Sequence, residues 1–140
     1  MRRREIIAAA GAFAIAGSVT EATAQTEMHP PKYKALEEST SKCVATGEDC
    51  LRHCIAMMEM KDSSMAACAN MVLQLIASCR ALQTLASLNS TFTAAFAKDT
   101  AAVCAACEAE CRKFYTKYTV CKACADACKS CADDCRKVTA

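Results

Sequence analysis

The chain has 140 residues, enough for a single domain, and carries 17 Lys and Arg residues against 15 Asp and Glu residues, a net charge of +2. A balance this close to neutral excludes the strongly basic surface typical of nucleic-acid-binding proteins, so we expect no nucleic-acid partner. Thirteen cysteines, no tryptophan and three glycines mean that cysteine must supply part of any core.

Residues 1–24 have the pattern of a signal peptide. Three arginines at positions 2–4 precede an apolar run over residues 6–19, which is too short to span a bilayer, and residues 22–24 form an Ala-x-Ala cleavage motif. Consecutive arginines in this place favour twin-arginine export over the Sec route. We therefore expect an exported, periplasmic protein whose mature chain begins near Gln25. An N-terminal core helix is the alternative.

Residues 25–31 form a short linker that ends in two prolines, and one cysteine-rich domain is predicted over residues 32–140. Beyond Pro31 there is no proline and one glycine, so only short turns interrupt the helices. Leu, Ile, Val and Phe make up 17 of the 116 residues after position 24, and no uncharged apolar stretch there is long enough to span a bilayer. We therefore expect no membrane span after signal removal.

Four helices are predicted after the linker. The first runs from just after Pro31 to about Met60 and the second over about 64–87, because residues 62–64, Asp-Ser-Ser, are a stop-and-cap signal. Residues 89–91, Asn-Ser-Thr, cap a third helix that ends near Phe114. A fourth helix follows a turn within residues 115–119, where aromatic and β-branched residues weaken helical structure.

One long helix from Asn89 to Lys137 is the alternative to this last turn. It would be about 75 Å long and could not bury its apolar stripe within one small domain. Four helices with short connections instead predict an all-α fold: an antiparallel up-down-up-down four-helix bundle with a thiol-lined core.

The cysteines recur in these helices at steps of three and four residues, which is the spacing of one helix face. Five lie on the predicted fourth helix and three on the third, and the others are spaced more sparsely along the first two. The candidate metal ligands are all thirteen: Cys43, Cys50, Cys54, Cys68, Cys79, Cys104, Cys107, Cys111, Cys121, Cys124, Cys128, Cys131 and Cys135.

Several interpretations compete for this pattern. An odd number of cysteines leaves at least one unpaired, and a disulfide between cysteines three or four residues apart would strain the helix, so structural disulfides fit poorly. Structural zinc places Cys-x2-Cys pairs on turns, whereas no glycine or proline separates Cys104 from Cys107. A single iron–sulfur cluster uses only four thiolates. A zinc or mixed soft-metal store, and a thiol-rich core without metal, stay open as alternatives.

Copper(I) fits the thiol pattern best. Soft thiolate and thioether ligands select it, and two or three sulfurs suffice, so cysteines along one helix can share an ion although they cannot form a disulfide. Thiolates without a cation would be many buried anions, and one Cu(I) per thiolate keeps the core near neutral. We therefore predict multiple Cu(I) ions per chain, about one for each cysteine.

Methionines gather where the predicted first helix ends and the second begins. In an up-down bundle this end also collects several cysteines, so it forms a mouth of soft ligands; core filling by methionine and a plain surface histidine are the alternatives. Gly47 gives room for an ion or allows close helix packing. The candidates for metal uptake at the mouth are His53, Met57, Met60 and Met65, with Met58 and Met71 beside them. The other end collects a hydrophobic plug of Leu36, Leu82, Leu85, Phe92 and Phe96.

The predicted second helix is apolar on two sides. Between Ser63 and Leu88 its only charge is Arg80, and Leu73 and Ile76 fall off its inward stripe. Such a helix needs a second partner, so we expect a homo-oligomer that packs through it.

The cysteine stripe over residues 121–135, the export signal and the mouth with His53 and Met57 resemble the exported copper storage proteins of methane-oxidising and other bacteria. The resemblance covers roughly residues 32–138. It implies a tetramer of four-helix bundles filled with Cu(I) thiolates, which supplies copper to a copper-requiring enzyme or chaperone.

No acid–base set accompanies the thiols, and the two histidines are poorly placed to activate them. We therefore expect a non-enzymatic copper store. A thiol-based redox or detoxification protein is the alternative from another class.

Overall fold

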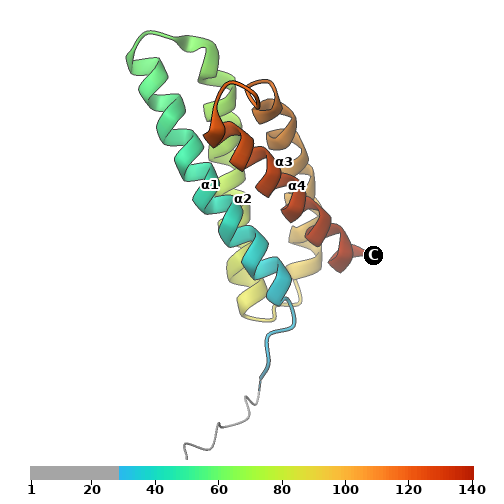
Figure 1. Cartoon of the computed structure of the whole chain (residues 1–140). Helices are drawn as coiled ribbons and strands as arrows, with labels where there is room; N and C mark the ends of the chain where they lie inside the picture. The colour runs from blue at the N-terminus through green and yellow to red at the C-terminus, as the bar shows by residue number, and fades with distance from the viewer. Residues whose placement is uncertain (1–28) are drawn as a thin grey trace, which may run out of the picture.

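The computed structural model describes residues 29–140, and within them it has four α-helices and no strand. The helices run antiparallel in the order of the chain, each packed against its neighbours in sequence, and the last also packs against the first (Figure 1). Their bounds are α1, Lys34–Glu59; α2, Ala66–Ser87; α3, Thr93–Arg112; and α4, Thr119–Thr139. The predicted all-α four-helix bundle is confirmed. The signal expected over residues 1–24 lies outside the described residues.

The turns between the helices follow local side-chain chemistry. Asp62 Oδ1 accepts a hydrogen bond from the Ser64 N–H at 2.9 Å and starts a short 3₁₀ turn, Ser63–Met65, that leads into α2. Ser90 Oγ accepts from the Phe92 N–H at 3.2 Å before α3 begins. Residues 113–118 form the turn into α4, so the alternative of one long helix from Asn89 to Lys137 is excluded.

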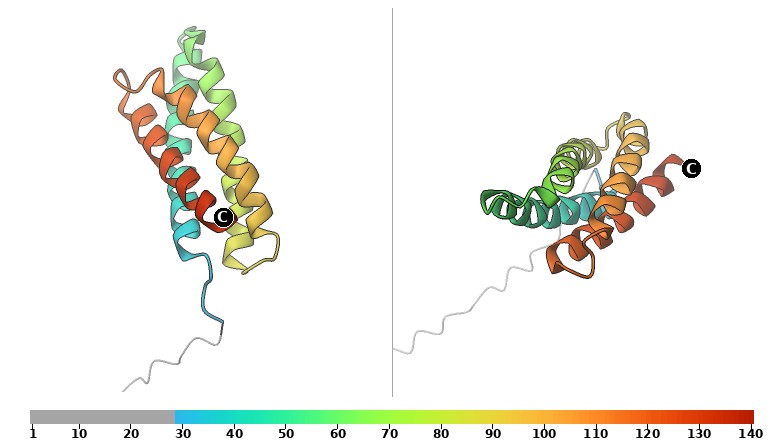
Figure 2. Two further views of the ribbon diagram at one scale, coloured as in Figure 1. Left: turned by 90° about the vertical axis from the view of Figure 1, so that its right-hand side faces the viewer. Right: turned by 90° about the horizontal axis from the view of Figure 1, so that it is seen from above.

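Two pairs of helices, α1 with α2 and α3 with α4, surround the core in the view along the bundle (Figure 2). At Gly47 the helices α1 and α2 approach closely: a Cβ at this position would lie 3.2 Å from Ile76 Cγ1 and 3.5 Å from Val72 Cγ1. The space at Gly47 is therefore filled by α2 side chains, which favours the close-packing interpretation of this glycine over room for an ion.

The same contact corrects one expectation about α2. Ile76 is only 8% exposed, whereas Leu73 is 54% exposed. The prediction that both face outward is wrong for Ile76, because the missing side chain at Gly47 lets Ile76 pack into the α1–α2 interface. The segment Ser63–Ser87 is long and apolar enough to cross a membrane by length and composition, a test that core helices of bundles also pass; eight residues of α2 are buried here.

The predicted hydrophobic plug is also only partly correct. Leu36 and Leu82 are buried, but Phe92 and Phe96 are 65% and 45% exposed. Helix α3 begins at Thr93, and its inward positions, three and four residues apart, are Thr93, Ala97 and Thr100. The two phenylalanines therefore lie on the outer side of the helix. The end of the core is therefore completed by Thr93, Ala97 and Thr100 of α3 and by Thr40 of α1.

Candidate metal centre

Thirteen thiols fill the middle of the bundle. Every cysteine of the chain lies in the described part, each has no exposed surface, and none is joined in a disulfide. The cysteines of each helix lie on one face, at steps of three and four residues on α3 and α4 and at mostly wider helical spacings on α1 and α2. The antiparallel packing brings the thiols of different helices together.

Sulfur atoms contact one another across the helix interfaces. Cys50 Sγ of α1 lies 3.8 Å from both Cys68 Sγ of α2 and Cys121 Sγ of α4. Cys68 Sγ is 3.8 Å from Cys111 Sγ of α3, so all four helices contribute to one chain of sulfurs. Farther from the mouth, Cys79 Sγ and Cys104 Sγ are 4.0 Å apart. These separations are van der Waals contacts that a bridging metal ion can span.

Within the described residues the sulfurs form four groups whose members all lie within 4.8 Å of one another. Three groups contain three thiols, and the fourth contains one cysteine from each helix. Two or three soft sulfurs are the coordination that Cu(I) accepts, so each group is large enough to hold a soft ion. The groups are Cys50, Cys54 and Cys68; Cys50, Cys111 and Cys124; Cys107, Cys124 and Cys128; and Cys43, Cys79, Cys104 and Cys131.

Burial favours the protonated thiols in this core. The loss of hydration raises the pKa of Cys121 to about 11 and the pKa of Cys54 to about 12. Thiol–thiol hydrogen bonds act in both directions: the contact with Cys111 lowers the pKa of Cys68, while the contact with Cys107 raises the pKa of Cys111. A metal ion that binds to these thiolates must therefore displace protons.

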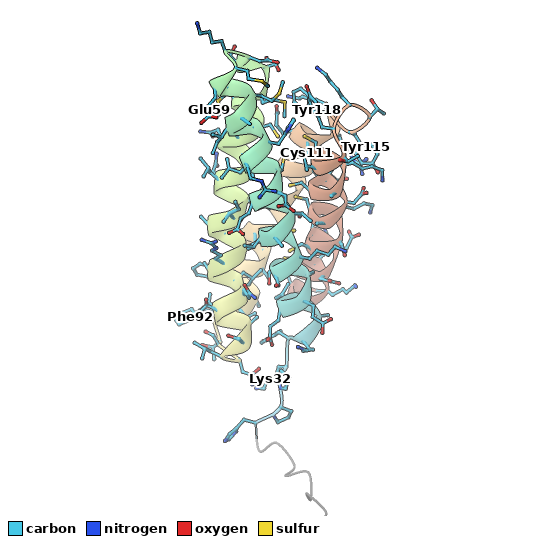
Figure 3. All side chains as sticks on the ribbon, turned by 60° about the vertical axis from the view of Figure 1, so that its left-hand side comes forward. Lys32, Glu59, Phe92, Cys111, Tyr115 and Tyr118 are labelled. Carbon is cyan, nitrogen blue, oxygen red and sulfur yellow. The ribbon has the colours of Figure 1, made fainter. Side chains whose placement is uncertain are left out.

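Tyr115 and Tyr118 lie at the same end of the bundle as Cys111, where α1 ends and α4 begins (Figure 3). The ring of His53 lies 4.3 Å from the ring of Tyr118, which stacks with Phe114 at 6.3 Å. His53 Nε2 is buried and makes no hydrogen bond to a described residue. The sequence predicted the turn that holds Tyr118 but not the contact of this residue with His53. The only sequence signal that Tyr118 lies near the thiols is its position one turn before Cys121.

The methionines named for uptake differ in exposure at this same end. Met60 is 68% exposed, Met57 is half-buried, and Met65 is fully buried within the core. Thioether ligands thus extend from the surface to the thiols, with His53 half-buried on the preceding turn of α1. At the opposite end, the buried threonines were missed, although Thr93 and Thr100 share one helix face with Cys104 and Cys107.

The family and the solved structures that resemble this chain are all described as copper storage proteins. Residues 29–140 match the family described as copper storage protein. The fold resembles apo copper storage protein 3 from Bacillus subtilis, with a TM-score of 0.68 and 25% identity over 76% of this chain and 98% of that one. No curated protein matches.

Two structures from Streptomyces lividans show the same fold at 23% identity. One is a copper storage protein loaded with 10 copper equivalents, with a TM-score of 0.69 over 84% of this chain and 92% of that one. The other, a cytosolic copper storage protein with five coppers, has a TM-score of 0.55 over 76% of this chain and 96% of that one.

These comparisons correct the predicted location. The expectation of an exported, periplasmic protein is wrong, because the similar solved structures include one described as cytosolic. The prediction depended on arginines, a short apolar run and an Ala-x-Ala motif within residues 1–24, whereas the comparisons involve the folded domain.

Proposed function

The chain belongs to the copper storage protein family, and from that premise we propose that it holds several Cu(I) ions per chain on the cysteine thiolates of its core. The proposed storage domain is residues 32–140, and the proposed ligands are all thirteen cysteines. The observation that carries the proposal is that all thirteen thiols are fully buried and that eleven of them form groups of three and four within 4.8 Å. Storage of an ion is not an enzyme class, and we propose no catalysed reaction.

Charge sets the proposed capacity. Each bound thiolate contributes one negative charge to a core without exposed surface, and each Cu(I) contributes one positive charge. A capacity of about one ion per thiolate therefore leaves the filled core close to neutral. A shared thiolate can bridge two ions, so the groups that have Cys50 or Cys124 in common can form one continuous cluster.

Anaerobic titration with Cu(I) against a coloured Cu(I) chelator tests this capacity. We expect about thirteen ions to bind before the chelator competes, and Cys124→Ala with Cys128→Ala to lower the number by about two. Leu51→Ala is the control, because it removes no sulfur. A capacity of one or two ions in the reduced protein would contradict storage, and a coloured protein as isolated would favour an iron–sulfur or redox role.

Copper is proposed to reach the core through His53, Met57, Met60 and Met65. The support is the decreasing exposure from Met60 to Met65 and the buried His53 Nε2, which makes no hydrogen bond within residues 29–140. Replacing the three methionines by leucine removes the thioethers at similar volume, so we expect stopped-flow uptake to slow while the capacity is unchanged. Met71→Leu is the matched control. Uptake at normal speed with a lower capacity would make these residues part of the store.

We also propose that the chain forms a homo-oligomer through α2, a tetramer by resemblance, and that a copper-requiring enzyme or chaperone receives the ions. The outward face of α2 supports the first point, since Leu73 is 54% exposed and neighbouring positions are uncharged. Leu73→Glu should reduce the mass seen by light scattering and leave the copper capacity unchanged. An unchanged mass would remove this face from the interface.

A further inference from the structure

One group of thiols differs from the others in its geometry. Cys43 of α1, Cys79 of α2, Cys104 of α3 and Cys131 of α4 have Sγ atoms that all lie within 4.8 Å of one another, and none of the four is exposed. Within residues 29–140 it is the only group of four, and it takes one ligand from each helix. A single Cu(I) ion is satisfied by two or three sulfurs, so four converging thiols exceed what one copper ion requires.

Four converging thiolates match the closed tetrahedral coordination of zinc. With Zn–S bonds of about 2.3 Å, the sulfurs of such a site lie roughly 3.8 Å apart. Cys79 Sγ and Cys104 Sγ are already 4.0 Å apart, and no pair exceeds 4.8 Å. Inward movement of each side chain by less than about 1 Å therefore completes the tetrahedron.

The backbone around this group is held in place independently of a metal. Ser78, next to Cys79, shares a hydrogen bond of 2.9 Å with Thr100, which stands one turn before Cys104. Gly47, one turn after Cys43, holds α1 close to α2. Ligands fixed on packed helices are positioned before the ion arrives, which is the property of a built site.

We propose that Cys43, Cys79, Cys104 and Cys131 bind one zinc ion in the copper-free protein. Four thiols release four protons, the zinc ion takes four thiolates, and no coordination position is left for water. The ion ties the four helices together at one level, and Cu(I) that binds to the same sulfurs releases it. The site does not depend on copper storage, because it uses a different metal and a fixed set of four ligands.

Anaerobic titration of the reduced, metal-free full chain with Co(II), a coloured substitute for zinc, tests the site. We expect the first equivalent to give the absorption of tetrahedral cobalt with four thiolates and one equivalent of zinc to abolish it. Cys131→Ala should weaken cobalt binding by more than about tenfold. Loss of a residue that only hydrogen-bonds to a metal ligand already lowers metal affinity by roughly 10–100-fold, and Cys131 is itself a ligand. Cys121→Ala, on the same helix but in none of the four groups, is the matched control.

The same samples separate this proposal from copper storage. A first equivalent bound by three or fewer sulfurs, or equal losses in Cys131→Ala and Cys121→Ala, would overturn the zinc site. Circular dichroism checks the fold of each variant, and Cys104→Ala replaces Cys131→Ala if that variant is unfolded. Cu(I) titration of the unsubstituted chain runs in parallel: normal copper capacity without the cobalt spectrum overturns the zinc site alone.

Discussion

Helices α2 and α4 are nearly equal in length, 22 and 21 residues, but they bury different side chains. The buried face of α2 carries four large apolar residues among two cysteines and two alanines: Val72, Leu75, Ile76 and Leu82. The buried face of α4 has five cysteines and three alanines. Full burial of a leucine or valine contributes about 1.5–3 kcal/mol, and α4 has no such residue.

This difference means that the residues that stabilise the bundle and the residues that bind metal lie mainly on different helices of one core. Helix α2 supplies most of the apolar volume that holds the metal-free bundle together, whereas α4 supplies the most ligands and depends on small side chains for its packing. A core that is to be filled with ions must leave its ligands free of bulky neighbours, and the helix with the most ligands buries no large aliphatic side chain. Three experiments test this division.

The largest effect is expected from a pair of truncations, one on each helix. Leu75→Ala should lower the free energy of unfolding of the metal-free protein by about 2–5 kcal/mol, with little change in copper capacity, because it removes aliphatic volume and no sulfur. Cys128→Ala should cost less than half as much, since a thiol is small, and lower the capacity by about one ion. Chemical denaturation and Cu(I) titration measure both. Equal destabilisation would contradict the division.

Copper loading should stabilise α4 more than α2. Ligands that bind only the folded state add about 2.7 kcal/mol at a hundred times the dissociation constant, and α4 contributes five of the thirteen ligands against two from α2. Hydrogen exchange of the metal-free and loaded protein, followed peptide by peptide, should show the larger slowing at α4. Slowing that is equal in the two helices would mean that the metal acts on the bundle as a whole.

The smallest effect is expected where α1 meets the aliphatic face of α2. Alanine is favoured over glycine within a helix by about 1 kcal/mol, but the new Cβ of Gly47→Ala would meet Ile76 Cγ1 at 3.2 Å. These two effects oppose each other. The midpoint of thermal unfolding should therefore change by less in Gly47→Ala than it falls in Ala45→Gly, the control at an exposed position of the same helix. A full gain of stability in Gly47→Ala would show that the two helices are not tightly packed there.

Spacing alone predicted much of this arrangement. Helical spacing placed all thirteen cysteines on inward faces, and turn chemistry at Asp62 located the α1–α2 boundary within a few residues. The bundle was predictable because helix periodicity is a local property of the chain.

The contacts between helices were harder to predict, because they depend on register and on which side chains are missing. Ile76 is buried only because position 47 lacks a side chain, and Phe92 is exposed because α3 begins one residue later. The group of four thiols has one member on each helix, so no spacing along the sequence could indicate it. The contact of Tyr118 with His53 joins the ends of two different helices, so spacing along the sequence could not indicate it either.

The most direct test of the account is the position of copper in crystals of the fully loaded protein, located by its anomalous scattering. We expect the ions to lie along the core between α1 and α4, each about 2–2.3 Å from two or three Sγ atoms, with the greatest number beside the five thiols of α4. Copper confined to His53 and the exposed methionines, with the α4 thiols unoccupied, would contradict storage in the core.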